Sequence, residues 1–156
     1  REAGRQGVDP GRIFFAPFIA QERHLARLAA ADLFLDTLPY NAHTTASDAL
    51  WAGVPLVTCI GDTFASRVAA SLLHAVGCDE LITRSLDEYQ ALALELARDR
   101  TRLTDIRRRL IEARDEAPLF DSPRFAIDLE GLFERMAQRH RDGLAPDSLW
   151  AREDDQ

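Results

Sequence analysis

The sequence predicts an α/β fold, a Rossmann-like parallel sheet with helices on both faces, followed by a helical C-terminal segment. Two observations carry this prediction. Short apolar runs alternate with helical patterns over residues 12–84, and only helical patterns follow from residue 85. Strands separated by helices are typical of a parallel sheet with right-handed crossovers. The predicted strands are apolar almost throughout, which indicates that both faces of the sheet are covered.

Four apolar runs are expected to form the strands, the first of them the buried run RIFFAP, which ends at a proline. The strands are predicted at residues 12–17, 32–36, 54–58 and 81–82. Helical patterns fill the intervals, and Gly53 and Gly77 mark the ends of two of them, as glycine commonly does. These helices are predicted at residues 21–31, 43–52 and 64–76.

Three more helices are predicted in the C-terminal part. Ser85 and Glu88 have the spacing of a capping box, and Ser122 before Pro123 is typical of a helix start. The helices are expected over about 85–98, 101–116 and 122–143. We therefore predict a core over residues 1–84 that is incomplete at its N-terminal side, helices packed on the same lobe over 85–146, and a polar tail over 147–156.

The charge pattern narrows the possible partners. The 156-residue chain has a formal charge of −7, and all 19 of its basic residues are arginine. An acidic balance argues against a general nucleic-acid surface. Seven arginines gather between residues 98 and 114, where we expect the solvated face of a helix.

Location follows from what the sequence contains and lacks. No apolar run approaches the length of a membrane span, and the first ten residues show no secretion signal. Cys59 and Cys78 stand in apolar surroundings without metal-ligand spacing, so we expect buried free thiols in the reducing cytoplasm. Because the first residue is Arg1 rather than methionine, we expect a piece of a longer protein.

The sharpest functional signal is the start of the helix that follows the second predicted strand. After the turn at residues 37–42, this helix opens with His43, Thr44 and Thr45, and Asp48 lies one turn further on. Free amides and hydroxyls at a helix N-terminus bind anions, and a carboxylate beside them suits a ribose. Together they indicate a nucleotide site. The same residue types also cap ordinary helices, and the pattern alone favours that structural role.

Other chemistry finds little support. The sequence has no G-x-G-x-x-G fingerprint and no Walker A motif. A dehydrogenase or a P-loop kinase is therefore not supported. No histidine and carboxylate spacing resembles a metal motif, so we expect neither a metal nor another cofactor. Asp36, at the end of the second strand, could be a base, but capping the turn is the favoured role.

Longer stretches of the chain closely resemble a known family. The residues that carry the resemblance are LFLDT at 33–37, HTTASDALWAGVPLVT at 43–58, GDTFASRVAAS at 61–71 and PLF at 118–120. They are similar to the C-terminal catalytic region of O-linked N-acetylglucosamine transferases and of the related plant SPINDLY-type O-fucosyltransferases. The resemblance runs from about residue 12 to 150. It implies the C-terminal, donor-binding lobe of a GT-B glycosyltransferase.

The resemblance also implies roles for individual residues. His43, Thr44 and Thr45 correspond to the motif that holds the diphosphate and sugar of the donor, and Asp48 to the residue that binds the ribose. On the base side, the backbone near Ile19 corresponds to the segment that reads the base edge.

Two more residues belong to the base side. His24 corresponds to the histidine that packs on the base. Gln21 stands where the best-known animal enzymes have a lysine near the nucleotide. Its neutral amide can still hydrogen-bond but supplies no charge, so the affinity for the donor and the identity of the donor stay open. The catalytic residues stay unknown, because the resemblance puts them on the opposite lobe.

The implied function is transfer of N-acetylglucosamine from UDP-N-acetylglucosamine to Ser or Thr hydroxyls of proteins, in a bacterial enzyme with tetratricopeptide repeats. The isolated chain is expected to be inactive. Two alternatives stay open. The chain could be an O-fucosyltransferase lobe that uses GDP-fucose, or a non-catalytic nucleotide- or protein-interaction module of the same fold.

Overall fold

A parallel sheet forms the centre of the computed structural model, which describes residues 1–151. Its strands are β1 (Phe34–Leu35), β2 (Leu56–Cys59) and β3 (Ile82–Thr83), in the order β1-β2-β3. Phe34 pairs with Leu56, and Thr58 pairs with Ile82. The predicted parallel sheet is therefore confirmed, with each strand shorter than or shifted from its predicted range.

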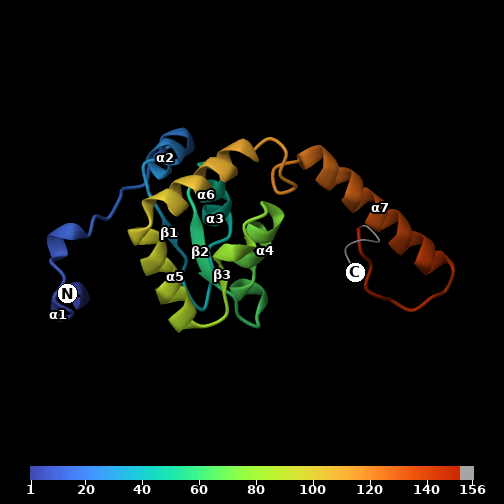
Figure 1. Ribbon diagram of the computed structural model, residues 1–156. Helices are drawn as coiled ribbons and strands as arrows, with labels where there is room; N and C mark the ends of the chain where they lie inside the picture. The colour runs from blue at the N-terminus through green and yellow to red at the C-terminus, as the bar shows by residue number, and fades with distance from the viewer. Residues whose placement is uncertain (152–156) are drawn as a thin grey trace.

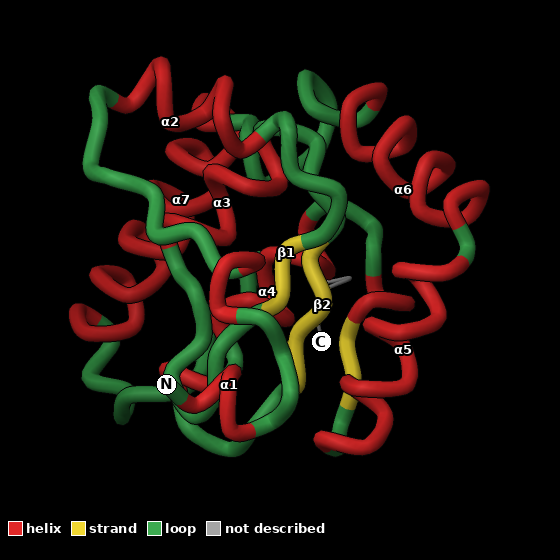
Figure 2. Tube along the Cα trace, turned by 90° about the vertical axis from the view of Figure 1, so that its left-hand side faces the viewer, coloured by secondary structure: helices red, strands yellow, loops and turns green. Residues whose placement is uncertain are grey.

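Helices cover both faces of this sheet, as predicted. The α3 and α4 helices contact β2 from one side, and α5 contacts β2 and β3 from the other. Figure 2 shows the strands between these two layers, with α6 beside α5. The bounds are α1 Glu2–Arg5, α2 Gln21–Leu28, α3 Thr44–Trp51, α4 Val68–Ala75, α5 Leu86–Arg98, α6 Arg100–Glu112 and α7 Ser122–Arg141.

The core lies between the strands and their covering helices. Leu56, Leu73, Leu81 and Leu96 come from four different elements, and each has no exposed surface. Burying a leucine side chain contributes roughly 1.5–3 kcal/mol, so this cluster is the main source of the stability of the sheet and its helices.

The first predicted strand is wrong. Residues 10–12 form a short 3-10 helix, and residues 13–20 have no regular structure. Phe14 is 87% exposed and Phe15 is 94% exposed. This segment runs away from the body toward α1 (Figure 1), out of reach of β1. An apolar run becomes a strand only where a sheet edge can accept its backbone hydrogen bonds, and no described strand lies beside it.

The starts of α5 and α7 differ in detail from those predicted. At the capping box, the Glu88 amide donates to Ser85 Oγ (3.2 Å), and Glu88 accepts from the Arg84 amide (2.8 Å), as predicted in kind. The last helix is capped one residue earlier than expected, because Asp121 rather than Ser122 accepts from the Arg124 amide (2.9 Å). A carboxylate one residue upstream reaches the free amides equally well.

The helix predicted over 64–76 is two pieces, a 3-10 turn at Phe64–Ser66 followed by α4. Thr63 and Ser66 form a reciprocal capping box across that turn. Another short 3-10 turn, Asp79–Leu81, leads into β3.

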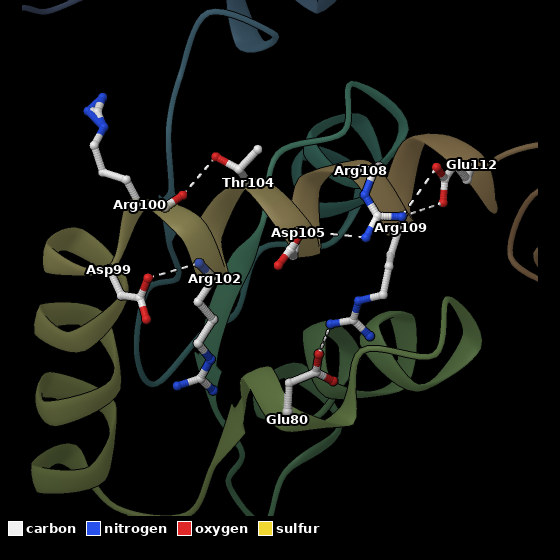
Figure 3. A network of polar contacts seen from close by, with 9 residues as sticks. All are labelled: Glu80, Asp99, Arg100, Arg102, Thr104, Asp105, Arg108, Arg109 and Glu112. Carbon is white, nitrogen blue, oxygen red and sulfur yellow. Dashed lines mark hydrogen bonds and ion pairs between the residues drawn. The ribbon is translucent and has the colours of Figure 1, made fainter.

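The arginine-rich helix α6 only partly fits the predicted solvated face. Figure 3 shows exposed arginines paired with acidic neighbours, Arg108 with Asp105 and Glu112, and Arg109 with Glu80. Such exposed pairs contribute little to stability. Three arginines of the stretch differ, because Arg102, Arg107 and Arg114 are half-buried. The Arg114 guanidinium lies over the Trp51 ring, 5.2 Å from its centroid.

The remaining predictions about the chain fare unevenly. Cys59 and Cys78 are buried free thiols, as predicted. Within residues 1–151, no helix is both long and apolar enough to cross a bilayer. The division at residues 84 and 146 stays a prediction, and the end of the polar tail, 152–156, lies outside the described residues.

Candidate functional site

The turn after β1 is built around the buried carboxylate of Asp36. Its Oδ1 accepts from the amides of Thr37 (2.8 Å) and Ala42 (2.7 Å), and its Oδ2 accepts from the Thr58 hydroxyl (2.6 Å). The side chain is 6% exposed. A nearly buried carboxylate that accepts from three donors holds the turn, so the structure favours the capping role over that of a base.

Two further side chains fix this turn, one from α5 and one from the turn itself. The Tyr89 hydroxyl donates to the Asp36 carbonyl (2.9 Å), and burial followed by the charge of Asp36 raises the pKa of Tyr89. The side chain of the buried Asn41 donates from Nδ2 to the Thr37 carbonyl (3.0 Å), and its backbone amide donates to the Ala65 carbonyl (2.9 Å). The loops that follow β1 and β2 are thereby joined at the carboxyl edge of the sheet, where open α/β sheets bind ligands.

His43 sits between these two loops as the N-cap residue of α3. Its ring stacks on Tyr40, with centroids 4.8 Å apart, and meets Phe64 edge-on at 6.0 Å. Its Nε2 lies 3.4 Å from the Ala65 carbonyl. The half-buried imidazole is therefore held between Tyr40 and Phe64 at the start of α3.

The first turn of α3 presents free donors. The amides of Ala46 and Ser47 donate to the His43 carbonyl (3.0 and 3.1 Å). Within residues 1–151, the amides of Thr44 and Thr45 have no acceptor, and both side chains are exposed. Two free amides, two hydroxyls and the positive end of the helix dipole together suit an anion such as a diphosphate.

Asp48 lies one turn further along the same helix and is half-buried. It follows Thr44 by four residues, so the two side chains share one face of α3. A carboxylate set back from the amides accepts hydrogen bonds from vicinal hydroxyls without facing the phosphates, as a ribose contact requires.

The base-side residues predicted from the resemblance lie on and before α2. Ile19 is half-buried in the preceding loop, Gln21 is the exposed first residue of α2, and His24 is half-buried on its next turn. The α2 helix packs beside α3, so the structure brings both groups onto neighbouring helices. No hydrogen bond in the described part of the chain joins the two groups directly.

Arg27 is a residue of this region that the sequence analysis missed. Its guanidinium donates to His24 Nδ1 (3.0 Å) and to the Pro17 carbonyl (2.9 Å). Because a guanidinium can only donate, Nδ1 must accept, and neutral His24 carries its proton on Nε2. The spacing of three residues on one helix face was the available signal.

Residues 1–129 match the model of Glycosyl transferase family 41. The chain belongs to this family. The match covers the turn after β1, the whole of α3 and the whole of α2. The family assignment thus rests on the elements that carry the candidate site, and the expected GT-B-type α/β lobe is confirmed.

Relatives and a solved structure agree with the family. The chain is 39% identical over 144 residues to a UDP-N-acetylglucosamine–peptide N-acetylglucosaminyltransferase of Caenorhabditis elegans, covering 92% of this chain and 12% of that protein. It is 37% identical to a SPINDLY protein of Solanum lycopersicum, with 90% and 15% covered. A mutant O-GlcNAc transferase of Thermobaculum terrenum superposes with a TM-score of 0.79 at 36% identity, with 85% and 26% covered.

The chain therefore spans between about a tenth and a quarter of the length of these relatives. The name of the Caenorhabditis elegans relative specifies a donor, UDP-N-acetylglucosamine, and a peptide acceptor.

Proposed function

We propose that this chain binds the nucleotide of the sugar donor in a protein O-glycosyltransferase that transfers N-acetylglucosamine from UDP-N-acetylglucosamine to Ser or Thr hydroxyls. One observation carries the proposal, the pair of free amides at Thr44 and Thr45 in the first turn of α3. Family membership and the donor named for the relatives support it.

The reaction requires a stabilised leaving group. The acceptor oxygen attacks the anomeric carbon, the bond from that carbon to the phosphate oxygen breaks, and UDP leaves with the bonding pair. Negative charge then grows on the diphosphate. Fixed amides and hydroxyls at the start of α3 stabilise that charge most where water is excluded. Asp48 fixes the ribose, and the base rests on the α2 side near His24.

The hydroxyl proton goes to a base that we assign to no residue of this chain. In the proposal, the acceptor and the base come from the opposite lobe, and tetratricopeptide repeats present the acceptor protein. A cytoplasmic, bacterial enzyme is part of the same proposal. The free thiols of Cys59 and Cys78 support a reducing compartment.

A second donor is favoured by one observation. Gln21 is exposed at the first position of α2 and carries no charge, where the resemblance implies a lysine. A neutral amide both donates and accepts, so it suits a guanine edge as well as a uracil edge. GDP-fucose is therefore the alternative donor.

The test is calorimetric titration of the full 156-residue chain with UDP, GDP and UDP-N-acetylglucosamine. We expect UDP to bind more tightly than GDP. We expect the affinity for UDP to fall roughly tenfold or more in Asp48→Ala and in the double variant Thr44→Ala/Thr45→Ala, since hydrogen bonds to charged groups contribute about 1.5–3 kcal/mol.

The matched control is Thr101→Ala. Thr101 is an exposed threonine in the first turn of α6, away from the candidate site, and its replacement should leave UDP affinity unchanged. Tighter binding of GDP would transfer the proposal to the fucose donor. A folded chain that binds none of the three ligands contradicts the proposal.

A further inference from the structure

The position of α2 depends on contacts with other elements. It has only eight residues, and none of them is buried. A helix this short is marginal by itself in water. Whatever holds α2 therefore also holds Gln21 and His24, which lie in its first two turns.

The contact at the far end of α2 comes from α6. The Arg107 guanidinium donates from one nitrogen to the Ala31 carbonyl (2.8 Å) and from the other to the Ala29 carbonyl. These carbonyls belong to the C-cap residue of α2 and to the turn after it, beside the end of the helix that carries negative partial charge. A planar guanidinium can satisfy two such acceptors at once, which an ammonium cannot do with the same geometry.

The same helix also contacts the far end of α3. Gly53 follows α3 with φ +73°, and a Cβ placed there would lie 2.6 Å from Cγ1 of Ile111. α6 therefore packs against the C-terminal ends of the two helices whose N-terminal ends carry the candidate site. It holds α3 by close apolar packing and α2 by the polar contact of Arg107.

We infer that Arg107 is a positioning residue for the base side of the nucleotide site. It does not touch the ligand. It fixes the C-terminal end of α2, and through the helix it sets where His24 lies relative to the first turn of α3. This inference rests on the proposed function, because it concerns the nucleotide bound there.

The test measures UDP affinity of the full chain carrying Arg107→Gln or Arg107→Lys. The control is Arg108→Gln, because Arg108 is exposed and, within residues 1–151, its ion pairs are with Asp105 and Glu112 of its own helix (Figure 3). We expect Arg107→Gln to lower the affinity for UDP on the order of 3- to 30-fold, the range found for residues without ligand contact. Lysine should rescue part of the loss, and Arg108→Gln should change nothing.

Double-mutant cycles separate positioning from general stability. If Arg107 acts through α2, the effect of Arg107→Gln on UDP affinity disappears in a His24→Ala background and persists in a Thr45→Ala background. The NMR signal of the His24 ring should also shift in Arg107→Gln, with that of the His43 ring unchanged. A loss of stability alone would act equally in both backgrounds.

The outcomes distinguish the two proposals. Wild-type chain that binds no UDP overturns the proposed function and this inference with it. Wild-type binding that Arg107→Gln leaves unchanged, or weakens equally in both backgrounds, overturns the inference alone. Loss confined to backgrounds that keep His24, with partial rescue by lysine, supports it.

Discussion

Asp36 illustrates why a residue type can leave its role open. An aspartate at the carboxyl end of a strand in a parallel sheet occupies the position of many catalytic groups, and the sequence offered both a base and a turn cap. The structure decides because the carboxylate accepts from two amides of its own turn and from the Thr58 hydroxyl of a different strand. Thr58 is 22 residues away, and no local pattern shows that it will face Asp36.

Cys78 predicts a dependence of stability on pH. Its side chain is 1% exposed, and burial, followed by the charge of Glu80, raises the pKa of the thiol to about 11. In the unfolded chain the thiol ionises near pH 9. The contribution of the buried thiol to the free energy of unfolding is therefore fully present below pH 9 and is lost between about pH 9 and 11. Two pKa units correspond to a loss on the order of 2–3 kcal/mol.

Urea titrations of wild type and Cys78→Ala at pH 8, 9, 10 and 11 check this prediction. The difference in unfolding free energy between the two should narrow as the pH rises. Tyr89, whose pKa is also raised, is present in both proteins, so its own pH dependence cancels in the difference. A difference independent of pH would contradict the raised pKa.

At the scale of elements, the junction of α3 and α6 rests on a glycine. Gly53 and Gly77 both have positive φ (+73° and +69°), but only Gly53 has a neighbour where a Cβ would stand. Gly77→Ala should cost roughly 1–2 kcal/mol for the left-handed backbone. Gly53→Ala should cost about 1–3 kcal/mol more, because Ile111 must move.

The cycle that isolates this clash adds Ile111→Ala, a side chain that is 47% exposed. Thermal or urea unfolding should show that Ile111→Ala recovers most of the extra loss in Gly53→Ala and none of the loss in Gly77→Ala. Equal costs of the two glycine substitutions would mean that α6 adapts freely to α3. In that case the close packing seen at this junction would not be what fixes it.

At the scale of the whole molecule, stability is concentrated in the sheet and its covering helices. α7 has 20 residues and buries none, and Figure 1 shows it extending away from the sheet. Its apolar residues Phe125, Phe133 and Met136 are more than half exposed. Most of the stability of a helix in a protein comes from packing against the rest of the fold, and α7 gains little of it because none of its residues is buried.

We therefore expect the amides of α7 to exchange with deuterium at least ~100-fold faster than those of β2, whose exchange requires opening of the core. Hydrogen exchange followed by mass spectrometry measures both in one experiment. α5 serves as the internal control, because it is also a surface helix but buries Leu96 against the sheet. Protection of α7 equal to that of α5 would contradict the prediction.

The sequence by itself determined the periodic elements, the parallel arrangement of the later strands, the helix start at His43 and the family. These follow from local signals, apolar spacing and caps, which act over a few residues. Only the tertiary structure decided the rest. Residues 13–17 have the pattern of a strand but no described strand beside them. In the sequence, Arg107 is one of seven neighbouring arginines, and only the structure shows its guanidinium at the end of α2. Both depend on which group lies across from a residue, and that is fixed by packing between distant parts of the chain.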